Sequence, residues 1–387
     1  MSSPPIPLLI VAGEASGDLH GARLLSELAR LAPRVAPFGL GGDLMRAAGL
    51  DPVAHSAEIS VVGITEVLKI LPRARQIFAA LLAEVDRRRP EAAVLVDFPD
   101  FNLRLAKQLK ARGIPVLYYI SPQVWAWRPG RVRAIARRVE RMLVLFPFEV
   151  GFYERAGVGV VHVGHPLVDE VPALPQAWDA EPAPPAGGPY RIALLPGSRR
   201  SEIAALLPTM LAAVRLLAAE LPVHVRLIQA PTIARELLEE EVELAGLPVV
   251  IVGEERFAAI ADSHLALCAS GTATLEVGLL GTPMIVCYRL GFWTHLLGRL
   301  LVRLEDVSLV NLVLGRRVVP ELIQGGARPP AIAREAARLL VDPVAVAAMR
   351  RGLAELRGRL GEGGASARAA REVARLVAAG APAGAAA

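Results

Sequence analysis

Cysteine, lysine and aromatic residues are scarce in this 387-residue sequence. The two cysteines, Cys268 and Cys287, are too few for a disulfide framework or for a zinc site built from thiolates, and they fit a reducing cytoplasm. Lysine occurs only at positions 69, 107 and 110, so arginine supplies nearly all of the 43 basic side chains. The formal net charge of +5 is a weak indication of anionic partners, such as phosphates or an acidic membrane surface.

Long hydrophobic runs are also missing from the sequence. No uncharged apolar run reaches the roughly 18 residues that a membrane-spanning helix needs, and the N-terminus lacks the basic segment of a signal peptide. We therefore expect a soluble or surface-bound protein of the cytoplasm. Hydrophobic residues make up 53% of the sequence and charged residues 21%, which excludes an intrinsically disordered chain.

Short apolar runs alternate with amphipathic stretches along the chain. Such runs favour buried strands, and the helices between them favour parallel sheets covered on both faces. The sequence therefore predicts an α/β protein with two Rossmann-like doubly wound domains. The predicted strands cover residues 7–12, 92–96, 115–120, 142–145 and 160–163 in the first half, and residues 191–195, 223–229, 249–252, 265–268 and 284–287 in the second.

Residues 171–189 (VPALPQAWDAEPAPPAGGP) interrupt this alternation and are the best candidate for a linker. We expect an N-terminal domain over 1–170 and a C-terminal domain over 190–345. C-terminal helices over 346–377 would pack back on the N-terminal domain or on a partner subunit, before a disordered tail over 378–387. A ligand would bind in the cleft across which the two domains face each other.

Three turns rich in small residues each connect a predicted strand to a predicted helix. Main-chain N–H groups in such turns and at helix starts can bind anions. The first turn, AGEASGDLHG (12–21), does not have the glycine spacing of the dinucleotide-binding pattern. Its alternative role is a simple turn with Asp18 as a helix cap.

The other two turns lie in the second half of the chain. In LPGSRRSE (195–202), Arg199 could form paired charge-assisted bonds to a diphosphate, and a capping turn with solvated arginines is equally consistent. In ASGTATLE (269–276), Glu276 could accept hydrogen bonds from both hydroxyls of a ribose, or could only complement the helix dipole. Two such turns at the carboxyl ends of strands favour a nucleotide diphosphate as ligand.

Carboxylates follow the predicted strand 92–96 in the segment DFPDFN (97–102). They lie at the carboxyl edge of the first sheet, where sites form in open α/β folds. Asp97 could remove the proton of an acceptor hydroxyl while Asp100 caps the following helix, and the opposite assignment stays open.

Trp125 and Trp127 lie two positions apart in a predicted loop. If the loop is extended, both rings would face one way and form an apolar wall. Arg133, Arg137 and Arg141 would form one stripe if the next helix runs that far. The stripe would hold an anionic acceptor or would only face solvent.

Residues 59–82 and 291–304 are mostly apolar with a few basic residues. A short apolar face rimmed by arginine is typical of peripheral proteins on anionic lipid. A buried helix or a dimer interface would have the same composition, and periodicity does not decide between these alternatives.

Together, these segments resemble one family, the lipid-A-disaccharide synthases, which are bacterial glycosyltransferases. AGEASGD, PQVWAWR and the NL…VPELIQ segment are the most specific motifs, whereas the PGSR and SGTATLE turns are shared with other nucleotide-sugar enzymes. The resemblance extends over about residues 8–324 and rests on AGEASGDLHGARL (12–24), VVGITEVL (61–68), DFPDFN (97–102), YYISPQVWAWRPGR (118–131), GHP (164–166), LLPGSRRSEI (194–203), SGTATLEVGLLGTPMIVCYR (270–289) and SLVNLVLGRRVVPELIQ (308–324).

The resemblance implies a GT-B fold, with a UDP-sugar donor on the C-terminal domain and an acceptor on the N-terminal domain. The implied reaction is inverting transfer of 2,3-diacylglucosamine from UDP-2,3-diacylglucosamine to the 6-hydroxyl of 2,3-diacylglucosamine 1-phosphate (lipid X). It forms the β-1,6 disaccharide of lipid A and UDP, and no metal or other cofactor is expected. The expected surroundings are the cytoplasmic face of the bacterial inner membrane and a second copy in a homodimer, without nucleic acid.

The resemblance also implies roles for individual residues. Asp97 would be the base, with Glu14 and Asp100 as the other catalytic candidates. Glu276 would hold the ribose, and turn amides with Arg199 would stabilise the leaving UDP. The donor site would comprise Gly197, Ser198, Arg199, Ser270, Gly271, Thr272, Thr274, Glu276 and Asn311, with Glu321 in the same late segment, and the acceptor or lipid site would comprise Ser16, Trp125, Trp127, Arg133 and Arg137.

Two other functions remain consistent with the residues. Another GT-B enzyme that acts on a UDP-sugar, such as a UDP-N-acetylglucosamine 2-epimerase, would not need the apolar segment 59–82. A protein that only binds a nucleotide-sugar or an anionic lipid would use the Asp97 region structurally.

Overall fold

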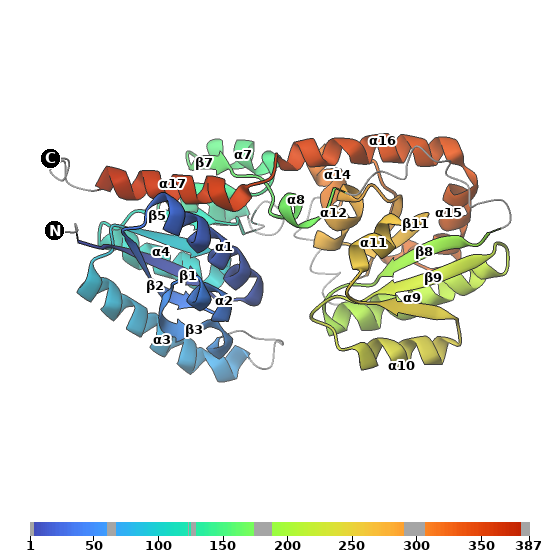
Figure 1. The fold of residues 1–387 in the computed structure, drawn as a ribbon, viewed down its shortest axis with the longest axis horizontal. Helices are drawn as coiled ribbons and strands as arrows, with labels where there is room; N and C mark the ends of the chain where they lie inside the picture. Colours follow the sequence, from blue (N-terminus) through green and yellow to red (C-terminus); the bar gives the residue numbers. More distant parts are fainter. Residues whose placement is uncertain are drawn as a thin grey trace. The chain divides into compact units, whose positions relative to one another are not determined.

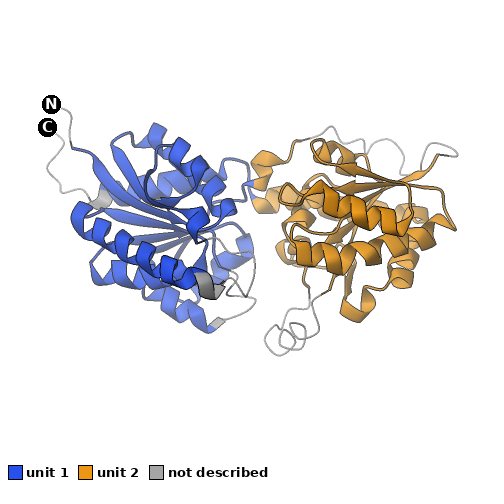
Figure 2. Ribbon diagram, turned by 90° about the horizontal axis from the view of Figure 1, so that it is seen from below, with its two compact units in different colours: residues 1–166, 361–387 blue, residues 167–360 orange. Residues whose placement is uncertain are grey.

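The chain folds into two compact units in a computed structural model that describes residues 4–59, 67–122, 124, 129–173, 188–289 and 306–380. Unit 1 comprises residues 1–166 and 361–387, and unit 2 comprises residues 167–360 (Figure 2). The chain therefore passes from unit 1 to unit 2 and returns. The last helix belongs to the N-terminal unit, which is one of the two packings expected for the C-terminal helices, whereas the helix before it remains in unit 2. Most of the expected linker lies outside the described residues.

Unit 1 contains a seven-stranded sheet in the order β3-β2-β1-β4-β5-β6-β7, with every neighbouring pair parallel. The α/β prediction is confirmed, but two of these strands, β2 and β3, are absent from the predicted set. Both are interrupted by proline, glycine or histidine and form no continuous apolar run. The strands are β1 (Ile6–Ala12), β2 (Val35–Gly41), β3 (Asp51–His55), β4 (Ala92–Val96), β5 (Val116–Tyr119), β6 (Arg141–Val144) and β7 (Gly159–His162).

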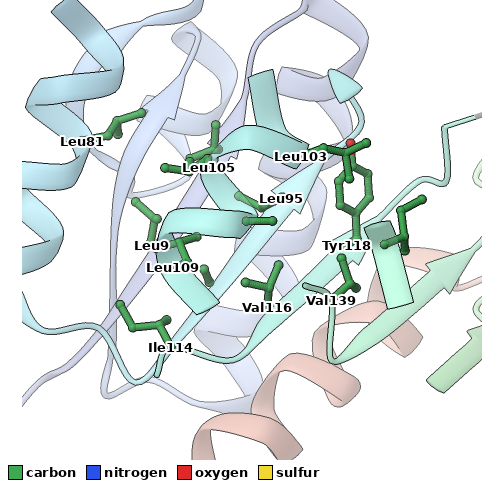
Figure 3. Close-up of a cluster of buried hydrophobic side chains, with 14 of the residues drawn as sticks. Leu9, Leu81, Leu95, Leu103, Leu105, Leu109, Ile114, Val116, Tyr118 and Val139 are labelled. Atoms are coloured by element: carbon green, nitrogen blue, oxygen red, sulfur yellow. The ribbon is translucent and has the colours of Figure 1, made fainter. Parts of the chain in front are cut away.

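Helices cover both faces of this sheet (Figure 1). On one face, leucines of α3 and α4 pack against apolar side chains of β1, β4 and β5 (Figure 3). On the other face, α1 and α17 contact each other and β4. The helices of unit 1 are α1 (Ala15–Leu31), α2 (Asp43–Ala47), α3 (Val67–Arg88), α4 (Pro99–Ala111), α6 (Val132–Ala136), α7 (Pro147–Glu154) and α17 (Ala365–Gly380), with the 3-10 turns η1 (Ser56–Glu58) and η2 (Pro129–Arg131).

The C-terminal helix α17 completes unit 1. Val373 and Val377 are buried on it, and the buried Glu372 pairs with Arg141 of β6 at 2.5 Å. Arg368 donates from Nε to the carbonyl of Val163 at 2.7 Å and from Nη1 to the carbonyls of residues 362 and 363, so it ties together the two segments at which the chain leaves and re-enters unit 1. Residues 378–380, expected in the tail, are helical.

Unit 2 contains a six-stranded parallel sheet in the order β10-β9-β8-β11-β12-β13. Five of its strands match the predicted runs, and the sixth, β13, is only three residues long. The strands are β8 (Tyr190–Leu195), β9 (Val223–Ile228), β10 (Val249–Val252), β11 (Leu265–Ala269), β12 (Met284–Tyr288) and β13 (Glu321–Ile323). The helices are α8 (Leu167–Glu170), α9 (Arg200–Ala218), α10 (Arg235–Ala245), α11 (Arg256–Ala261), α12 (Thr272–Leu279), α14 (Leu309–Leu314), α15 (Pro329–Val341) and α16 (Pro343–Leu360), with the 3-10 turn η4 (Gln324–Gly326).

Among the described residues, α9 alone has the length and hydropathy of a membrane span. Half of its apolar window is buried inside the protein, and the helix packs against α15 and β11. These contacts are those of a core helix in unit 2.

Each sheet has one point at which its winding direction reverses. In unit 1 this point lies between β1 and β4, and in unit 2 it lies between β8 and β11. Ala12 is the register partner of Val96, and Leu195 is that of Cys268. The turns after these strands therefore lie side by side in each unit, at the position where open α/β sheets bind ligands.

Replacing Val373 by alanine should lower the free energy of unfolding of unit 1 by about 2 kcal/mol, because it removes buried methyl groups and leaves a cavity under α17. Urea unfolding measures this change. Val344→Ala is the control, because Val344 is 75% exposed on α16 and its loss should change stability by less than about 0.5 kcal/mol. Equal stability of Val373→Ala and the unaltered chain would contradict the packing of α17 on unit 1.

Candidate functional site

Two carboxylates lie close together at the carboxyl edge of the sheet in unit 1. Asp97 follows β4 directly, and Glu14 stands between β1 and α1. Burial, reinforced by the negative charge of Glu14, raises the pKa of Asp97 to about 6, although the N–H of Phe98 donates to its carboxylate and opposes this rise. A carboxyl group with a pKa near neutrality is suited to accept a proton as a general base.

The backbone at Asp97 is strained. Asp97 and Phe98 are consecutive non-glycine residues in the left-handed region, with φ of +44° and +49°, and each such residue costs about 1–3 kcal/mol. The ring of Phe98 lies so close to the Cα of Gly13 that a Cβ at position 13 would have no room. The AGEASGD turn therefore needs glycine at position 13 in order to accommodate the segment that carries Asp97.

Asp100 is less suited to be the base. It lies in the first turn of α4, its side chain is 78% exposed, and it pairs with Arg131 at 2.8 Å. Phe98, and not Asp100, occupies the N-cap position of that helix. Of the two carboxylates in DFPDFN, Asp97 is thus the one that the surrounding protein removes from water.

The first turn of α1 presents Glu14 and Ser16, both exposed, at the same edge. Asp18 has a different role from the cap of α1 that the sequence allowed. Its carboxylate accepts hydrogen bonds, at 2.7–3.1 Å, from main-chain N–H groups at the start of α2, which are those of Gly42, Leu44 and Met45. Asp18 therefore fixes the loop after β2.

The expected arginine stripe does not form. The helix α6 ends at Ala136, so Arg137 follows its last residue and Arg141 lies in β6, paired with Glu372. Arg133 and Arg137 are exposed. Trp125 and Trp127 lie outside the described residues, as do residues 60–66 and 290–305, which hold all of the second apolar segment and part of the first.

In unit 2, the PGSR turn already binds a carboxylate. Gly197 has φ of +124°, and Ser198 and Arg199 after it are exposed. Glu202 accepts hydrogen bonds from the N–H groups of Ser198 at 2.9 Å and Arg199 at 3.3 Å, and it pairs with the Arg199 guanidinium at 2.8 Å. The N–H groups of the turn thus donate to an anionic oxygen. Glu202 is missing from the sequence-predicted site, although a glutamate at the third position of a helix is a capping signal.

The SGTAT turn lies beside the PGSR turn, at the start of α12. Gly271 occupies its N-cap with φ of +145°, and Thr272 is exposed in the first turn. Two of the expected ligand hydroxyls are used internally instead: Ser270 donates to the carbonyl of Val307 at 2.9 Å, and the buried Thr274 donates to the carbonyl of Gly271 at 2.8 Å. The turn offers a ligand its main chain and Thr272.

Glu276 lies one turn further along α12. Burial raises its pKa, while the guanidinium of Arg256, 3.6 Å away, lowers it and the carboxylate of Glu170 opposes that effect. Arg256 begins α11 and stacks over the ring of Phe257 at 4.4 Å. No motif in the sequence marks Arg256, because its relation to Glu276 depends on the packing of α11 beside α12.

Asn311 has a structural role rather than the expected contact with a donor. It is buried, its Nδ2 donates to the carbonyl of Val319 and to Glu321, and its Oδ1 accepts the N–H groups of Val318 and Val319. An amide side chain has no further hydrogen-bonding positions. Glu321 also accepts the N–H groups of residues 307 and 308, so both side chains fix the segment to which Ser270 is bonded.

No metal site is evident in the described ranges, where no three His, Cys, Asp or Glu side chains form a group that could hold an ion. The buried His165 has its pKa lowered to about 3 by burial and by the nearby His20 and His162. It is therefore neutral at physiological pH.

Replacing Asn311 by alanine should lower the free energy of unfolding by about 3 kcal/mol or more, because buried main-chain groups lose their partners. The affinity of the folded protein for UDP, the ligand that the resemblance implies, should stay unchanged. Thermal unfolding and calorimetric titration measure the two quantities. Unaltered stability together with lost UDP binding would instead indicate that Asn311 contacts the donor directly.

Comparison with known proteins identifies the family. Residues 8–362 match the family model described as lipid-A-disaccharide synthetase. The lipid-A-disaccharide synthase of Myxococcus xanthus is 47% identical over 385 residues, which cover 97% of this chain and 99% of that protein. The lipid-A-disaccharide synthase of Geobacter metallireducens is 44% identical over 95% of this chain and 97% of its own length.

Solved structures agree on the fold. The calicheamicin glycosyltransferase superposes with a TM-score of 0.59 at 18% identity, covering 98% of this chain and all of the other. At these identities the similarity shows the fold alone, which is the GT-B arrangement of two α/β domains seen in glycosyltransferases. The sequence relatives carry the assignment further: this chain belongs to the lipid-A-disaccharide synthase family of glycosyltransferases.

Proposed function

We propose that the chain transfers 2,3-diacylglucosamine from UDP-2,3-diacylglucosamine to the 6-hydroxyl of lipid X, with inversion at the anomeric carbon. The observation that supports this most directly is the pair of winding reversals. One bears a carboxyl group with a raised pKa, and the other bears two adjacent turns that suit a diphosphate. A UDP-sugar is also consistent with a fold neighbour, the UDP-N-acetylglucosamine 2-epimerase of Neisseria meningitidis bound to UDP-N-acetylglucosamine (TM-score 0.64, 12% identity, covering 96% of this chain and all of the other).

In the proposed step, Asp97 accepts the proton of the 6-hydroxyl while that oxygen attacks the anomeric carbon of the donor. The bond from the anomeric carbon to the diphosphate oxygen breaks, its electron pair leaves with UDP, and Asp97 later loses the proton to water. General-base catalysis of this kind typically supplies a factor of about 10²–10⁴. Glu14 supports it by raising the pKa of Asp97.

The departing UDP needs positive potential around its phosphates. We assign this role to the main-chain N–H groups at Gly197, Ser198 and Arg199 and to the start of α12 at Gly271 and Thr272. A phosphate oxygen would displace the carboxylate of Glu202 from the N–H groups of Ser198 and Arg199. Among the described residues, Arg199 forms an ion pair with Glu202, and the arginine of this pair is 77% exposed. Such pairs stabilise a protein by about 0–1 kcal/mol, so Arg199 can turn towards a phosphate at little cost.

Glu276 would then hold the ribose hydroxyls, with the guanidinium of Arg256 opposing the rise in pKa that burial causes. We propose that no metal or other cofactor takes part, since amides and arginine supply the positive charge. Activity that persists in excess EDTA would support this assignment, and its loss would contradict it.

The lipid substrates imply a site at the cytoplasmic face of the inner membrane, to which the protein would bind peripherally. The exposed Ser16, Arg133 and Arg137 would contact the acceptor or its phosphate. Trp125 and Trp127 stay predictions for the acyl chains, as does the homodimer.

Incubation with UDP-2,3-diacylglucosamine and lipid X, followed by mass spectrometry, tests the whole proposal. A disaccharide 1-phosphate is the expected product. UDP binding without that product would favour a binding protein, and conversion of a soluble UDP-sugar alone would favour an epimerase-like enzyme.

Asp97→Asn should lower kcat by about 10²–10⁴-fold and leave UDP affinity unchanged, because the amide keeps the shape of the side chain but accepts no proton. Steady-state rates and calorimetry measure these quantities. Asp86→Asn, which removes a surface carboxylate paired with Arg112, is the matched control and should retain full activity. A fully active Asp97→Asn protein would transfer the base role to Glu14 or Asp100.

The reaction rate should depend on pH through Asp97. The base acts only when deprotonated, so kcat should fall about tenfold per pH unit below pH 6 and level off above it. Glu14→Gln removes the neighbouring negative charge, which lowers the pKa of Asp97 and should move the acid limb to lower pH. An acid limb at the same pH in both proteins would contradict this coupling.

A further inference from the structure

The left-handed peptide at Asp97 is held from two sides by buried donors. The carbonyl oxygen of Asp97 accepts hydrogen bonds from Nδ2 of Asn102 at 2.8 Å and from the hydroxyl of Tyr118 at 2.6 Å. Its N–H donates to the carbonyl of Tyr119 at 2.9 Å, so both polar groups of this residue's main chain are fixed. Asn102 comes from α4 and the two tyrosines come from β5, so the holding groups belong to the rigid core of unit 1.

Asn102 occupies a position where an apolar side chain would fit the surroundings. It is fully buried, and its Nδ2 also donates to the carbonyl of Val96 at 3.2 Å. Its Oδ1 is buried with no hydrogen-bond partner among the described residues. An unpaired buried acceptor destabilises a fold, so the amide group is explained by the two carbonyls that it binds and not by packing.

Tyr118 combines a packing role with a polar one. Its ring lies in the hydrophobic cluster between β5 and α4, near Leu103 and Val139 (Figure 3). Burial raises the pKa of its hydroxyl well above the usual value, so the group stays protonated and remains a donor. Phenylalanine would fill the same space without this hydrogen bond.

We propose that Asn102 and Tyr118 are positioning residues that hold the carbonyl of Asp97 and thereby direct its carboxylate at the reacting hydroxyl. This inference rests on the proposed function, in which Asp97 is the base. Strained main chain persists only where its surroundings determine it. When one donor is lost, the peptide between residues 97 and 98 can rotate towards an ordinary conformation and carry the carboxylate with it. A displacement of about 1 Å can cost about 10²-fold in rate.

The test compares Tyr118→Phe, Asn102→Ala and the double variant in the full-length protein. Each single variant should lower kcat about tenfold with KM for the UDP-sugar unchanged. The double variant should lose more than the product of the two, because each single variant keeps one donor that still restrains the shared oxygen in part. Thr282→Val in unit 2 is the matched control, since it also removes a buried hydroxyl that donates to a main-chain carbonyl, that of Ile260, and it should keep kcat unchanged.

A second readout does not depend on activity. Carbon-13 NMR titration of the Asp97 carboxyl group, assigned with Asp97→Asn, should give a lower pKa in Tyr118→Phe than in the unaltered protein. Release from the strained position exposes the carboxylate to water and moves it from Glu14, the charged group that acts on it from the start of α1. The hydroxyl of Tyr118 faces it from β5, and Asp100 and Arg131 act on that hydroxyl. The acid limb of the rate profile should shift in the same direction.

A lower melting temperature of Tyr118→Phe with kcat, acid limb and carboxyl titration all unchanged would overturn the proposal, since the hydrogen bonds would then serve folding only. Should Asn102→Ala fail to fold, Tyr118→Phe decides alone. Asp97→Asn, measured in parallel, separates the proposed function from the positioning proposal. An active Asp97→Asn protein would contradict Asp97 as the base. An inactive Asp97→Asn protein together with an unaffected Tyr118→Phe protein would contradict only the positioning role.

Discussion

The parallel pairing of β1 with β4, and of β8 with β11, is the constraint on which both candidate sites depend. Helices cover each sheet on both faces, so polar groups concentrate where the strands end. At the reversal point of each sheet, helices leave in opposite directions and the two neighbouring turns have free space beside them. In unit 1 these turns carry Glu14 and Asp97, and in unit 2 they carry PGSR and SGTAT. The same topology thus places a carboxyl group with a raised pKa in one unit and two turns with main-chain N–H groups in the other.

Carboxylates on main-chain amides recur throughout the structure. Asp18 binds the first turn of α2, Glu202 binds the PGSR turn, and Glu321 binds residues 307 and 308. Each shows that main-chain N–H groups at a helix start or turn in this fold stabilise negative charge, and for Glu202 the guanidinium of Arg199 adds to this effect. Asp97 is the contrasting case, since its carboxylate receives a single main-chain N–H and is otherwise desolvated, which raises its pKa. The carboxylates of Asp18, Glu202 and Glu321 each receive two or more main-chain N–H groups, whereas that of Asp97 receives one. This difference separates carboxylates that fix the fold from the one whose pKa is raised towards neutrality.

Most of the fold could be predicted from the sequence, because continuous apolar runs and strand-to-helix turns report local structure. β2 and β3 could not, since VAPFGLG and DPVAH are interrupted by proline, glycine and histidine and depend on pairing with β1 for their conformation. The return of α17 to unit 1 was also open in the sequence, because Glu372 and Val373 find their partners only in the folded unit.

The candidate site was predictable to the level of segments but not of hydrogen bonds. The motifs located Asp97, Arg199 and Glu276 at strand ends. The motifs could not separate a side chain that faces a ligand from one whose hydrogen bonds are all made within the protein. For this reason Asn311 and Thr274 were expected in the donor site. The roles of Asn102 and Arg256 could not be predicted from the sequence. Asn102 bonds to main-chain carbonyls, which no motif displays, and Arg256 pairs with a residue of another helix.

A crystal structure of the protein with UDP and a short-chain analogue of lipid X tests the account most directly. The account predicts diphosphate oxygens on the amides of Ser198 and Arg199, ribose hydroxyls at Glu276, and the acceptor 6-hydroxyl within about 3.2 Å of the Asp97 carboxylate. UDP bound away from these two turns, or an acceptor hydroxyl with no carboxylate within reach, would contradict it.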